Sequence, residues 1–573
     1  MVWTQLTDSL AAALKTLGVW SEQRAARIEF AVPRDPTHGD WTTNIAMLLA
    51  KDLKQPPRTL AGQIARACMN DPAVFGPAEV AGPGFVNFRY TPAFLAAFPA
   101  EVEKEGAAFG HHDHAHGLRI QVEYVSANPT GPLNVVNARA AAVGATLVRL
   151  LRATGHDAEG EFYVNDSGNQ VDVLGASVAA RFAERIGADA AFPHNGYHGS
   201  YIRDVAADLS ETEARAALEC GDNGWFREHA LDRMLAWQRK DLADYGAEFA
   251  QWFRESRVHA SGDVWKSLAE LEARGMTYRA VKPEVDVSGG ERAQDSPDAS
   301  EATWLRTSRF GDDKDRVVVK GNGAPTYLLP DVAYHRDKRN RGFRHAIDLW
   351  GPDHHGHILP LQAALQALGL EPDFLEVLIV QQVNLLSGGQ PVKMSKRAGE
   401  FITLRDLMDD VGADCAKFFF LLRGTSTHLD FDLDLAKQQN DENPAYYVQY
   451  AHARICSVLR YAAERGLEPA RGAVTVWSAP EELAMVRTLA TFPEIVRGAA
   501  WAREPQRIPV YLMETAASFH RFYHQCRVVT DDVKQSRARL QLVDATRIVV
   551  RNGLALMGVS APERMERTME PVA

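Results

Sequence analysis

The strongest constraint on the fold is a strand, loop, helix and strand pattern that begins near residue 118. Residues 119–125 have the composition of a buried strand, residues 133–152 form an amphipathic helical pattern, and residues 161–164 resemble a second strand. Gly155 is a plausible end for the helix, because glycine accepts the left-handed conformation common at helix ends. Two strands joined through a helix run in the same direction, so the pattern predicts a βαβ unit of a parallel sheet.

The regions on either side of this unit have different patterns. Residues 1–110 combine helical stretches at 10–17 and 44–53 with a strand at 85–88, which predicts a separate α+β domain. The His-rich residues 110–117 read as a linker, and a solvated linker is favoured over a metal site because glycines flank the histidines. From residue 441 onward the pattern is almost wholly helical, which predicts a helical domain over 441–573. Its helices are expected at 446–465, 481–500, 509–528 and 537–557.

The α/β region, residues 118–440, is expected to carry an insertion at about 170–315. Helices are predicted at 176–186 and 264–274, followed by an acidic, turn-rich surface segment at 288–303. The sheet is then expected to resume as a hairpin, with strands at 316–319 and 326–329 around the Asn322-Gly323 turn. Further strands are predicted at 346–349 and 376–381, with a helix at 358–368 between them.

Composition excludes several classes of protein. The chain has 573 residues, of which 46% are hydrophobic and 24% charged, and its net charge is −11. These values exclude a disordered chain and a generally basic nucleic-acid coat. The five cysteines are far apart and none belongs to a Cys-x-x-Cys pair, which argues against a disulfide framework and a thiolate zinc site. No run reaches about 18 apolar residues, and the N-terminus has the pattern of an amphipathic helix rather than a signal peptide, so a cytoplasmic protein without a membrane segment is expected.

Two segments carry residues suited to phosphate chemistry. The first is Val392-Lys393-Met394-Ser395-Lys396-Arg397, which follows a Ser387-Gly388-Gly389 turn and is expected at the end of a parallel strand. Ammonium groups on such a loop suit a polyphosphate, although a solvated basic turn is the alternative. The second is residues 123–133, which join the first strand to the helix that begins near Asn134. A helix N-terminus there would present free N–H groups to an anion.

Together the two segments resemble the arginyl-tRNA synthetases, which are class I aminoacyl-tRNA synthetases with the signatures His-x-Gly-His and Lys-Met-Ser-Lys. The second signature is intact as Lys393-Met394-Ser395-Lys396. Residues 126–132, 162–170, 326–335 and 447–454 are also similar to that family. The resemblance implies an α/β fold with a Rossmann-like parallel-sheet catalytic core at 118–440. It also implies that residues 1–110 form an additional tRNA-contacting domain and residues 441–573 an all-helical anticodon-binding domain.

The first signature departs from the family pattern. This chain has Asn134-Val135-Val136-Asn137 in its place. Either asparagine could donate an amide N–H to a phosphate oxygen, but neither supplies an imidazolium charge. Val136 stands where a glycine would let adenine approach the backbone closely, so its side chain is expected to crowd the nucleotide. The departure predicts weaker or shifted binding of ATP.

The resemblance also assigns residues to the substrates. A guanidinium group is bound best by carboxylates in a bidentate arrangement and by an aromatic ring, and Glu123, Tyr327 and Asp331 stand at the family's guanidinium-binding positions. Taken alone, Glu123 could instead be an exposed strand carboxylate and Tyr327 a half-buried core aromatic. Asn128 would hold the α-amino or carboxylate end of arginine. His354 and His357 are expected near the nucleotide, with metal binding by His354, His355 and His357 as the alternative.

Transfer RNA requires positive surface and groups that stack on bases. Residues 335–344 form a basic run that could face phosphate or could be a solvated helix end. Tyr447, Tyr450 and Arg454 are spaced to share one helix face, and the resemblance places them at the anticodon loop, although such a stripe is more often core.

The resulting prediction is ATP-dependent attachment of L-arginine to its tRNA through an arginyl-adenylate, for use in translation. Lys393, Lys396, Asn134 and Asn137 would be catalytic, and ATP would also contact Met394, Ser395, His354 and His357. Magnesium would accompany ATP, no protein-bound zinc or other metal is assigned, and a monomer is expected. The resemblance further implies that tRNA is needed for the first step. The alternatives are a catalytically weakened paralogue that acts as a tRNA-binding or regulatory protein, and another adenylylating α/β enzyme with the same lysine-rich loop.

Overall fold

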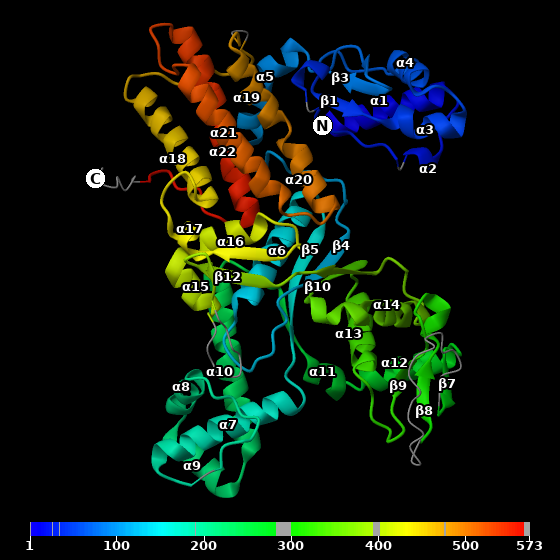
Figure 1. Cartoon of the computed structure of the whole chain (residues 1–573), viewed down its shortest axis with the longest axis vertical. Coiled ribbons are helices and arrows are strands. Elements are labelled where there is room, and N and C mark those ends of the chain that lie inside the picture. Colours follow the sequence, from blue (N-terminus) through cyan, green and yellow to red (C-terminus); the bar gives the residue numbers. More distant parts are fainter. Residues whose placement is uncertain are drawn as a thin grey trace.

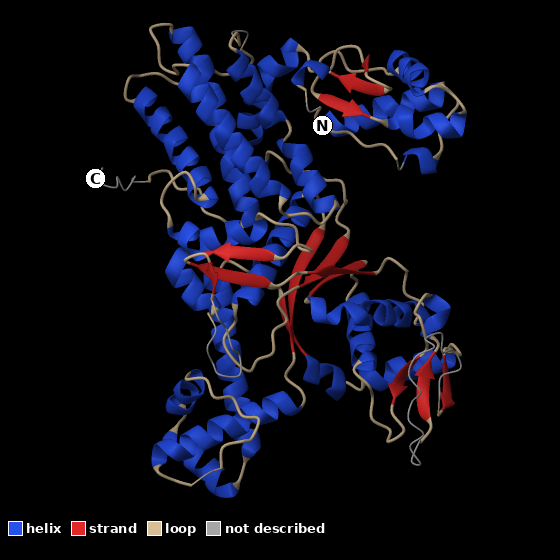
Figure 2. Ribbon diagram, viewed as in Figure 1, coloured by secondary structure: helices blue, strands red, loops and turns tan. Residues whose placement is uncertain are grey.

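The structure is a computed structural model that describes residues 2–25, 27–33, 35–189, 191–281, 300–392, 402–474 and 477–565. A central α/β core lies among four outlying parts: an N-terminal domain, two lower lobes, and a helical C-terminal domain (Figure 1). Strands are concentrated in the middle of the molecule, and the C-terminal domain is made of long helices (Figure 2). None of the helices within the described ranges is both long and apolar enough to cross a membrane.

The N-terminal domain packs helices on a small antiparallel sheet of strand order β1-β3-β2. Its elements are α1 (Val2–Thr16), α2 (Glu22–Ala25), β1 (Trp41–Thr43), α3 (Ile45–Leu53), α4 (Pro57–Ala67), β2 (Glu79–Ala81), β3 (Phe85–Phe88) and α5 (Pro92–Glu105). Helix α5 begins after the N-cap Thr91, and its first residue is Pro92. Proline is tolerated there because an N–H at the first helical position would have no acceptor within the helix. Helix α5 packs against the C-terminal helix α22 (Val533–Met557), so the N-terminal domain contacts the C-terminal domain.

Within the described residues the central sheet has five parallel strands in the order β11-β10-β4-β5-β6. These strands are β4 (Arg119–Glu123), β5 (Asp157–Val164), β6 (Gln251–Arg254), β10 (His345–Trp350) and β11 (Leu375–Ile379). Helix α6 (Val135–Ala153) crosses from β4 to β5, which confirms the predicted βαβ unit. The strand order reverses between β4 and β10, and ligands of open parallel sheets bind beyond the carboxyl ends of strands at such a point.

Two lobes extend below the sheet in Figure 1. The first lies between β5 and β6 and consists of α7 (Asn169–Ile186), α8 (Tyr201–Asp208), α9 (Glu211–Cys220) and α10 (Asn223–Asp244). The second contains α11 (Glu255–Ala260), α12 (Asp263–Ala273), α13 (Leu328–Asn340), η4 (Pro352–His357) and α14 (Ile358–Ala367), with an antiparallel sheet of order β7-β8-β9. The strands of that sheet are β7 (Thr277–Ala280), β8 (Ala302–Leu305) and β9 (Arg316–Val319).

The predicted hairpin at 316–329 is present only as a short turn, in which the Lys320 N–H donates to the Ala324 carbonyl at 2.8 Å and the Thr326 N–H to the Val318 carbonyl at 2.9 Å. Strand β9 pairs with β8 in the separate antiparallel sheet and does not rejoin the central sheet. Beyond the Asn322-Gly323 turn the chain forms a single bridge between Val319 and Pro325, and α13 begins at Leu328. Proline at 325 has no N–H for a ladder, so the second strand cannot develop. The acidic segment predicted at 288–303 lies mostly outside the described residues, and its last two residues belong to β8.

A third sheet, of order β13-β12-β14, was not foreseen from the sequence. It contains β12 (Val383–Ser387), β13 (Gln390–Pro391) and β14 (Leu429–Asp432) and is covered by α15 (Leu404–Val411), α16 (Ala413–Leu421) and α17 (Leu433–Lys437). The Ser387-Gly388-Gly389 turn joins β12 to the antiparallel strand β13. Strand β12, which precedes this turn, pairs in parallel with β14, and the short strand β13 then pairs with β12 antiparallel. The expected parallel strand before the turn is therefore present, but it belongs to this small mixed sheet and not to the central sheet.

The C-terminal helices are α18 (Pro444–Ala463), α19 (Pro480–Ala490), α20 (Phe492–Trp501), α21 (Arg507–Gln525) and α22. The single helix predicted at 481–500 is two helices that meet at Thr491, because Pro493 lacks the N–H that a continuous helix requires. The His-rich linker is also not solvated throughout. His112 is buried, its N–H donates to the Ala153 carbonyl at 2.6 Å, and its ring bonds to the Pro493 carbonyl at 2.7 Å.

Candidate active site

Three carboxylates lie side by side near the carboxyl end of the central sheet. The parallel register pairs Glu123 of β4 with Glu161 of β5 on one side and with Asp348 of β10 on the other. Paired residues of neighbouring strands face the same side of a sheet, so the three side chains form one row, which we call the acidic row. All three are buried. Buried carboxylates require hydrogen bonds and opposite charges, or they take up protons.

Helix α13 supplies these partners. Lys338 Nζ, whose side chain is fully buried, donates to Glu123 Oε2 and Asp348 Oδ1 at 2.8 Å each. The buried ring of His335 bonds through Nε2 to Asp348 Oδ2 at 2.8 Å. The Tyr334 hydroxyl donates to Glu161 Oε1 at 2.7 Å. Helix α13 thus covers the whole row with donors.

The basic run at 335–344 therefore faces the protein interior for much of its length. Arg341 pairs with Glu161 through both terminal nitrogens, at 2.5 and 3.0 Å. Arg336 pairs with Glu270 and Arg339 with Glu371. The expectation that this run faces RNA phosphate is wrong for Lys338 and Arg341, because the acidic row beneath the helix takes up their charges.

Of the proposed guanidinium ligands, Glu123 and Asp331 are close enough to repel each other, and Tyr327 precedes Asp331 by four residues at the start of α13. Burial raises the pKa of Glu123, and Lys338 opposes that shift. Burial also raises the pKa of the half-buried Asp331 to about 7, with repulsion from Glu123, Glu255 and Asp348 adding to the effect and His335 opposing it. Tyr327, at the start of α13, is 90% exposed. Glu123 is thus not an exposed strand carboxylate and Tyr327 is not a half-buried core aromatic.

The loop after β4 has an unusual backbone that aims Ser126 at Glu123. Val125 and Ser126 have φ values of 71° and 40°, a left-handed conformation that is rare for a β-branched residue such as valine. Ser126 Oγ donates to Glu123 Oε1 at 3.0 Å and accepts the Tyr163 N–H at 3.1 Å. Further along the loop, the exposed Asn128 accepts from Asn165 Nδ2 and donates to Gln170 Oε1, each at 2.9 Å.

The start of α6 is closed by a capping box. Asn134 Oδ1 accepts the N–H groups of Val136 at 3.0 Å and Asn137 at 3.2 Å, and Asn137 Oδ1 accepts the Asn134 N–H at 3.0 Å. The expectation that this terminus presents free N–H groups is wrong for these three residues, since the asparagine side chains already satisfy them. Because the box uses the amide oxygens, the Nδ2 groups of Asn134 and Asn137 are the donors that remain for an anion.

The start of α6, which carries the first signature, contacts the described segment that follows the second signature. Lys393, Met394, Ser395 and Lys396 lie outside the described residues, but the chain that follows them is described from Ile402. Thr403 forms a bridge with Asn134, and the Leu404 N–H donates to the Leu133 carbonyl at 2.7 Å. Thr403 and Leu404, which follow the second signature in the chain, are therefore held at the start of α6.

His354 and His357 lie in η4, which follows the carboxyl end of β10, and both are exposed. Their rings are 6.2 Å apart, and the Trp350 ring is 6.1 Å from His354. Because β10 neighbours β4, these rings lie at the same end of the sheet as Glu123. Across the described parts of the chain, no group of three His, Cys, Asp or Glu side chains could hold a metal ion.

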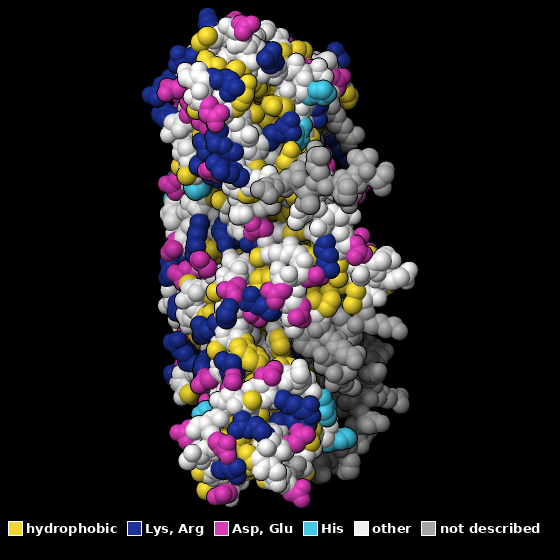
Figure 3. All heavy atoms as spheres, turned by 90° about the vertical axis from the view of Figure 1, so that its left-hand side faces the viewer, with side chains coloured by type: hydrophobic (Ala, Val, Ile, Leu, Met, Phe, Trp, Pro, Cys, Tyr) yellow, Lys and Arg dark blue, Asp and Glu magenta, His cyan; other side chains and the backbone are white. Residues whose placement is uncertain are grey.

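Two of the three residues predicted at the anticodon loop, Tyr447 and Arg454, contact α21 from α18. The Tyr447 ring is 5.2 Å from His520, and the Arg454 guanidinium lies 4.7 Å over the Tyr523 ring. Arg454 also donates to the Tyr450 hydroxyl at 3.3 Å. All three side chains are half-buried, so part of each contacts solvent. On the face drawn in Figure 3, Lys and Arg side chains occur over the helical domain at the top, mixed with acidic ones.

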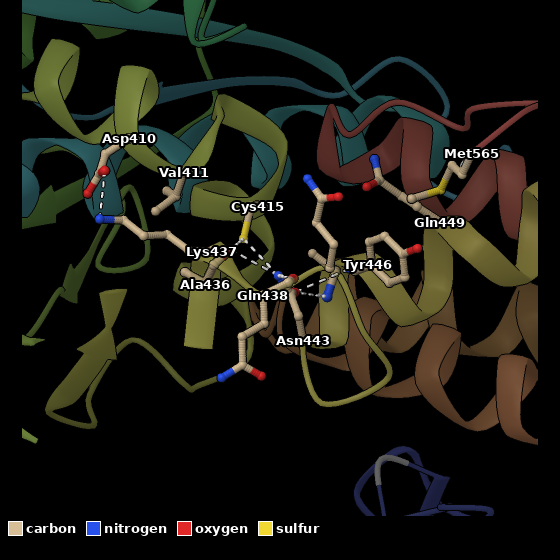
Figure 4. A pocket seen from close by; sticks show the side chains of 12 residues that line it. Asp410, Val411, Cys415, Ala436, Lys437, Gln438, Asn443, Tyr446, Gln449 and Met565 are labelled. Carbon is tan, nitrogen blue, oxygen red and sulfur yellow. Dashed lines mark hydrogen bonds and ion pairs between the residues drawn. The ribbon is translucent and has the colours of Figure 1, made fainter. Parts of the chain in front are cut away.

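A cavity of about 390 Å³ lies elsewhere, between the α15–α17 region and α18 (Figure 4). Its walls include Asp410 and Lys437, which form an ion pair at 2.7 Å, and Cys415. Asn443 holds the loop before α18 through the carbonyls of Ala436 and Gln438. None of the described residues that line this cavity belongs to the site predicted from the sequence.

Sequence reasoning missed the inner half of the site, namely Glu161, His335, Lys338 and Asp348. One signal was available: Asp348 interrupts the apolar strand Ala346-Ile347-Asp348-Leu349, and a buried acid in a strand needs a partner. The identity of that partner depends on the register between β10 and α13, which no local pattern contains.

Comparisons with known proteins agree with this architecture. Residues 4–90 match the arginyl tRNA synthetase N terminal domain, and residues 448–565 match the DALR anticodon binding domain. A solved methionyl-tRNA synthetase from Mycobacterium tuberculosis is 14% identical with a TM-score of 0.53, covering 78% of this chain and 92% of that one. The Thermus thermophilus arginyl-tRNA synthetase structure is 22% identical with a TM-score of 0.78, covering 99% and 100%.

The fold is therefore that of an aminoacyl-tRNA synthetase, with the parallel-sheet core and helical C-terminal domain predicted from the sequence. An arginine–tRNA ligase of Moorella thermoacetica is 43% identical over 573 residues, covering 98% of each chain. The chain belongs to the arginyl-tRNA synthetase family, which confirms the resemblance seen in its motifs.

Proposed function

We propose that this protein attaches L-arginine to its tRNA in two steps that use ATP. The arginine carboxylate attacks the α-phosphorus of ATP and releases pyrophosphate, and the terminal ribose hydroxyl of tRNA then attacks the adenylate. Catalysis comes from positioning and charge neutralisation, with no covalent enzyme intermediate. One observation supports this function best: two carboxylates, the buried Glu123 and the half-buried Asp331, lie near the switch point of the sheet. The chain that carries them belongs to the arginyl-tRNA synthetase family.

The amino acid occupies the crevice beyond β4. Glu123 and Asp331 bind the guanidinium group, because two carboxylates offer the planar acceptor geometry that it requires. The exposed Tyr327 ring covers the aliphatic part of the side chain from the solvent side. Asn128 holds the α-amino or carboxylate end and leaves the carboxylate directed toward the start of α6. Ionised carboxylates distinguish arginine from neutral side chains of similar size.

The nucleotide lies between the start of α6 and the lysine-rich loop. Asn134 and Asn137 donate their Nδ2 groups to phosphate, and His354 and His357 contact the nucleotide from beyond β10. Lys393 and Lys396, with Met394 and Ser395, neutralise and orient the triphosphate. Magnesium enters as its complex with ATP and supplies charge neutralisation at the phosphates; the described residues provide no three-ligand cluster of their own.

The helical domain contacts transfer RNA through Tyr447, Tyr450 and Arg454. The N-terminal domain contacts the outer corner of the tRNA. The half-buried aromatic rings of α18 leave surfaces on which bases can stack. The protein acts as a cytoplasmic monomer. The family match spans 98% of the chain and supports arginine–tRNA ligation. It gives no support to a regulatory paralogue or to another adenylylating enzyme.

The test is aminoacylation of bulk tRNA by the purified full-length protein with each of several labelled amino acids. Arginine alone is expected to become attached, and pyrophosphate exchange should depend on arginine and be stimulated by tRNA. Binding of tRNA without attachment of arginine would instead identify a weakened paralogue.

A further inference from the structure

We propose that Lys338 is a positioning residue for the arginine substrate: its buried ammonium group, together with Ser126, holds the Glu123 carboxylate in the orientation that receives the guanidinium group. This inference rests on the proposed function, because Glu123 must bind arginine for its orientation to affect the reaction. Lys338 itself does not touch the substrate.

The Glu123 carboxylate is held from two sides. Lys338 Nζ donates to Oε2 at 2.8 Å, and Ser126 Oγ donates to Oε1 at 3.0 Å. Each carboxylate oxygen can accept a second hydrogen bond, so one acceptor direction on each oxygen remains for a bidentate guanidinium group. The two donors therefore define the carboxylate plane before the substrate arrives.

Lys338 is itself fixed by its surroundings. The ammonium donates to Asp348 Oδ1 at 2.8 Å and lies 4.4 Å from the centroid of the Tyr334 ring. Asp348 is in turn bonded to His335, whose other ring nitrogen bonds to the Asp331 carbonyl at 2.7 Å. The side chain of Lys338 has no exposed surface, so it cannot leave Glu123 for solvent.

The same helix carries the proposed outer ligands along one face. Tyr327, Asp331, His335 and Lys338 are spaced by four, four and three residues, which places them on one stripe of α13. Exposure falls along that stripe, from 90% at Tyr327 through the half-buried Asp331 to 2% at His335 and 0% at Lys338. A substrate bound at Glu123 would therefore approach from the exposed Tyr327 end of the stripe, and Lys338 lies at its buried end.

The charge of Glu123 also depends on Lys338. Glu123 and Asp348 are direct neighbours on adjacent strands, and two buried carboxylates in that arrangement do not both stay ionised without a cation. Burial lowers the pKa of Lys338, but Asp348 and Glu123 raise it more, so the ammonium stays charged. With Lys338 ionised, the Glu123, Asp348 and Lys338 group carries one net negative charge, so Glu123 can act as an anionic ligand of the guanidinium group beside Asp331.

The pH dependence of Glu123 involves several neighbours. The titratable and charged groups that face it are Asp331, Tyr334, His335 and Lys338 from α13, Asp348 from β10, and Glu161 and Tyr163 from β5. Lys338 is the cation that lowers the pKa of Glu123 most. Removing it raises that pKa, so binding of arginine by the variant should require a higher pH than binding by the wild type.

The experiment compares full-length Lys338→Met and Lys338→Arg with the wild type in arginine-dependent pyrophosphate exchange with tRNA present. In Lys338→Met we expect KM for arginine to rise at least about tenfold, since removing one partner of a buried charge pair has effects of this size or larger. KM for ATP should change less than about twofold. The pH at which kcat/KM for arginine reaches half its maximum should move upward. Lys338→Arg keeps the charge and should return that pH to the wild-type value, whereas its larger, planar donor group should leave KM for arginine above the wild-type value.

Arg341→Met is the matched control. It removes a partly buried cation near the end of the same helix, but that cation pairs with Glu161, the neighbouring member of the acidic row. The control should lose stability, as Lys338→Met does, while its KM for arginine stays within about twofold of the wild type. If Lys338→Met does not fold, the charge-balanced double variant Lys338→Met/Asp348→Asn replaces it, with the same expected rise in KM for arginine.

Three outcomes would overturn the inference: a folded variant without Lys338 that keeps the wild-type KM for arginine, a parallel rise in KM for arginine and ATP, or an equal rise in Arg341→Met. The wild-type assay separates the two proposals. If the wild type attaches arginine to tRNA and Lys338→Met binds arginine normally, only the positioning role is wrong. If the wild type does not attach arginine, the proposed function fails and the inference fails with it.

Discussion

The two sides of the candidate active site hold their polar groups by different means. On the amino-acid side, Glu123 and Asp348 are buried against the Lys338 ammonium. On the nucleotide side, Asn134 and Asn137 hold each other through neutral amides. A buried charged group is costly to leave without its partner, whereas losing a neutral cap costs only about 1 kcal/mol.

The two halves of the candidate site therefore obtain their charge from different sources. The amino-acid side carries its own carboxylates and the cation that orients them, so it is organised before arginine binds. The nucleotide side has neutral amides at α6, and under the proposed function Lys393, Lys396 and the magnesium that accompanies ATP would supply its opposite charge. Substitutions should therefore separate into those that affect arginine and those that affect ATP.

The largest effect is expected from Asp331→Ala. Removing this carboxylate deletes one of the two anionic ligands proposed for the guanidinium group, and kcat/KM for arginine should fall by at least about 100-fold. KM for ATP should hardly change, because the residue belongs to the amino-acid side. Pyrophosphate exchange at varied arginine and at varied ATP measures both values. Exchange that survives unchanged would show that Asp331 does not bind arginine, and Asp331→Asn tests whether shape without charge suffices.

The next largest effect concerns stability. Asp348→Ala leaves the buried Lys338 and His335 without their shared carboxylate, so the free energy of unfolding should fall by about 3–5 kcal/mol. Denaturant unfolding measures the change. The control is Arg465→Ala, which removes an exposed ion pair with Glu464 and should cost less than about 1 kcal/mol. Equal losses in the two variants would contradict the view that the acidic row is held by buried charge.

The pH dependence should also differ between the two sides. Burial raises the pKa of Asp331 to about 7, so the carboxyl is protonated below that pH and ionised above it. Ionised Asp331 attracts guanidinium, hence KM for arginine should fall, by up to about tenfold, as pH rises through about 7. The same raised pKa means that folding binds a proton, so this group stabilises the fold below its unfolded pKa and the contribution is lost as pH rises through about 7.

A pH series of KM values tests this expectation, with Asp331→Asn as the comparison because it cannot ionise. The arginine profile of that variant should lack the transition near pH 7, and the ATP profile should be the same in both proteins. A transition that persists in Asp331→Asn must come from another group.

The smallest effect is expected on the nucleotide side. Val136→Gly removes the isopropyl group that was predicted to crowd adenine, and KM for ATP should fall by about two- to threefold. The cost is a less stable first turn of α6, by about 1 kcal/mol, because glycine is a poor helix former. KM for arginine is the internal control and should stay constant. No decrease in KM for ATP would mean that Val136 does not crowd the nucleotide.

Local patterns predicted much of the fold and named the outer part of the site. Periodicity identified the βαβ unit around α6, most of the long C-terminal helices and the strands at β10 and β11, because these depend on residues a few positions apart. It failed where one proline changed the outcome, at Pro325 in the expected hairpin and at Pro493 in the expected long helix. The motifs pointed to Glu123, Tyr327 and Asp331, but not to their surroundings.

The sequence by itself determined the family, the βαβ unit around α6 and most of the long helices, because these depend on short stretches of chain. The tertiary structure alone decided that the basic run of α13 turns inward. Lys338 and Glu123 are 215 residues apart, and only the register of β4, β5 and β10 brings three carboxylates into one row beneath that helix. Buried carboxylates attract the nearest cations away from solvent, and which cations are nearest is a property of the folded chain.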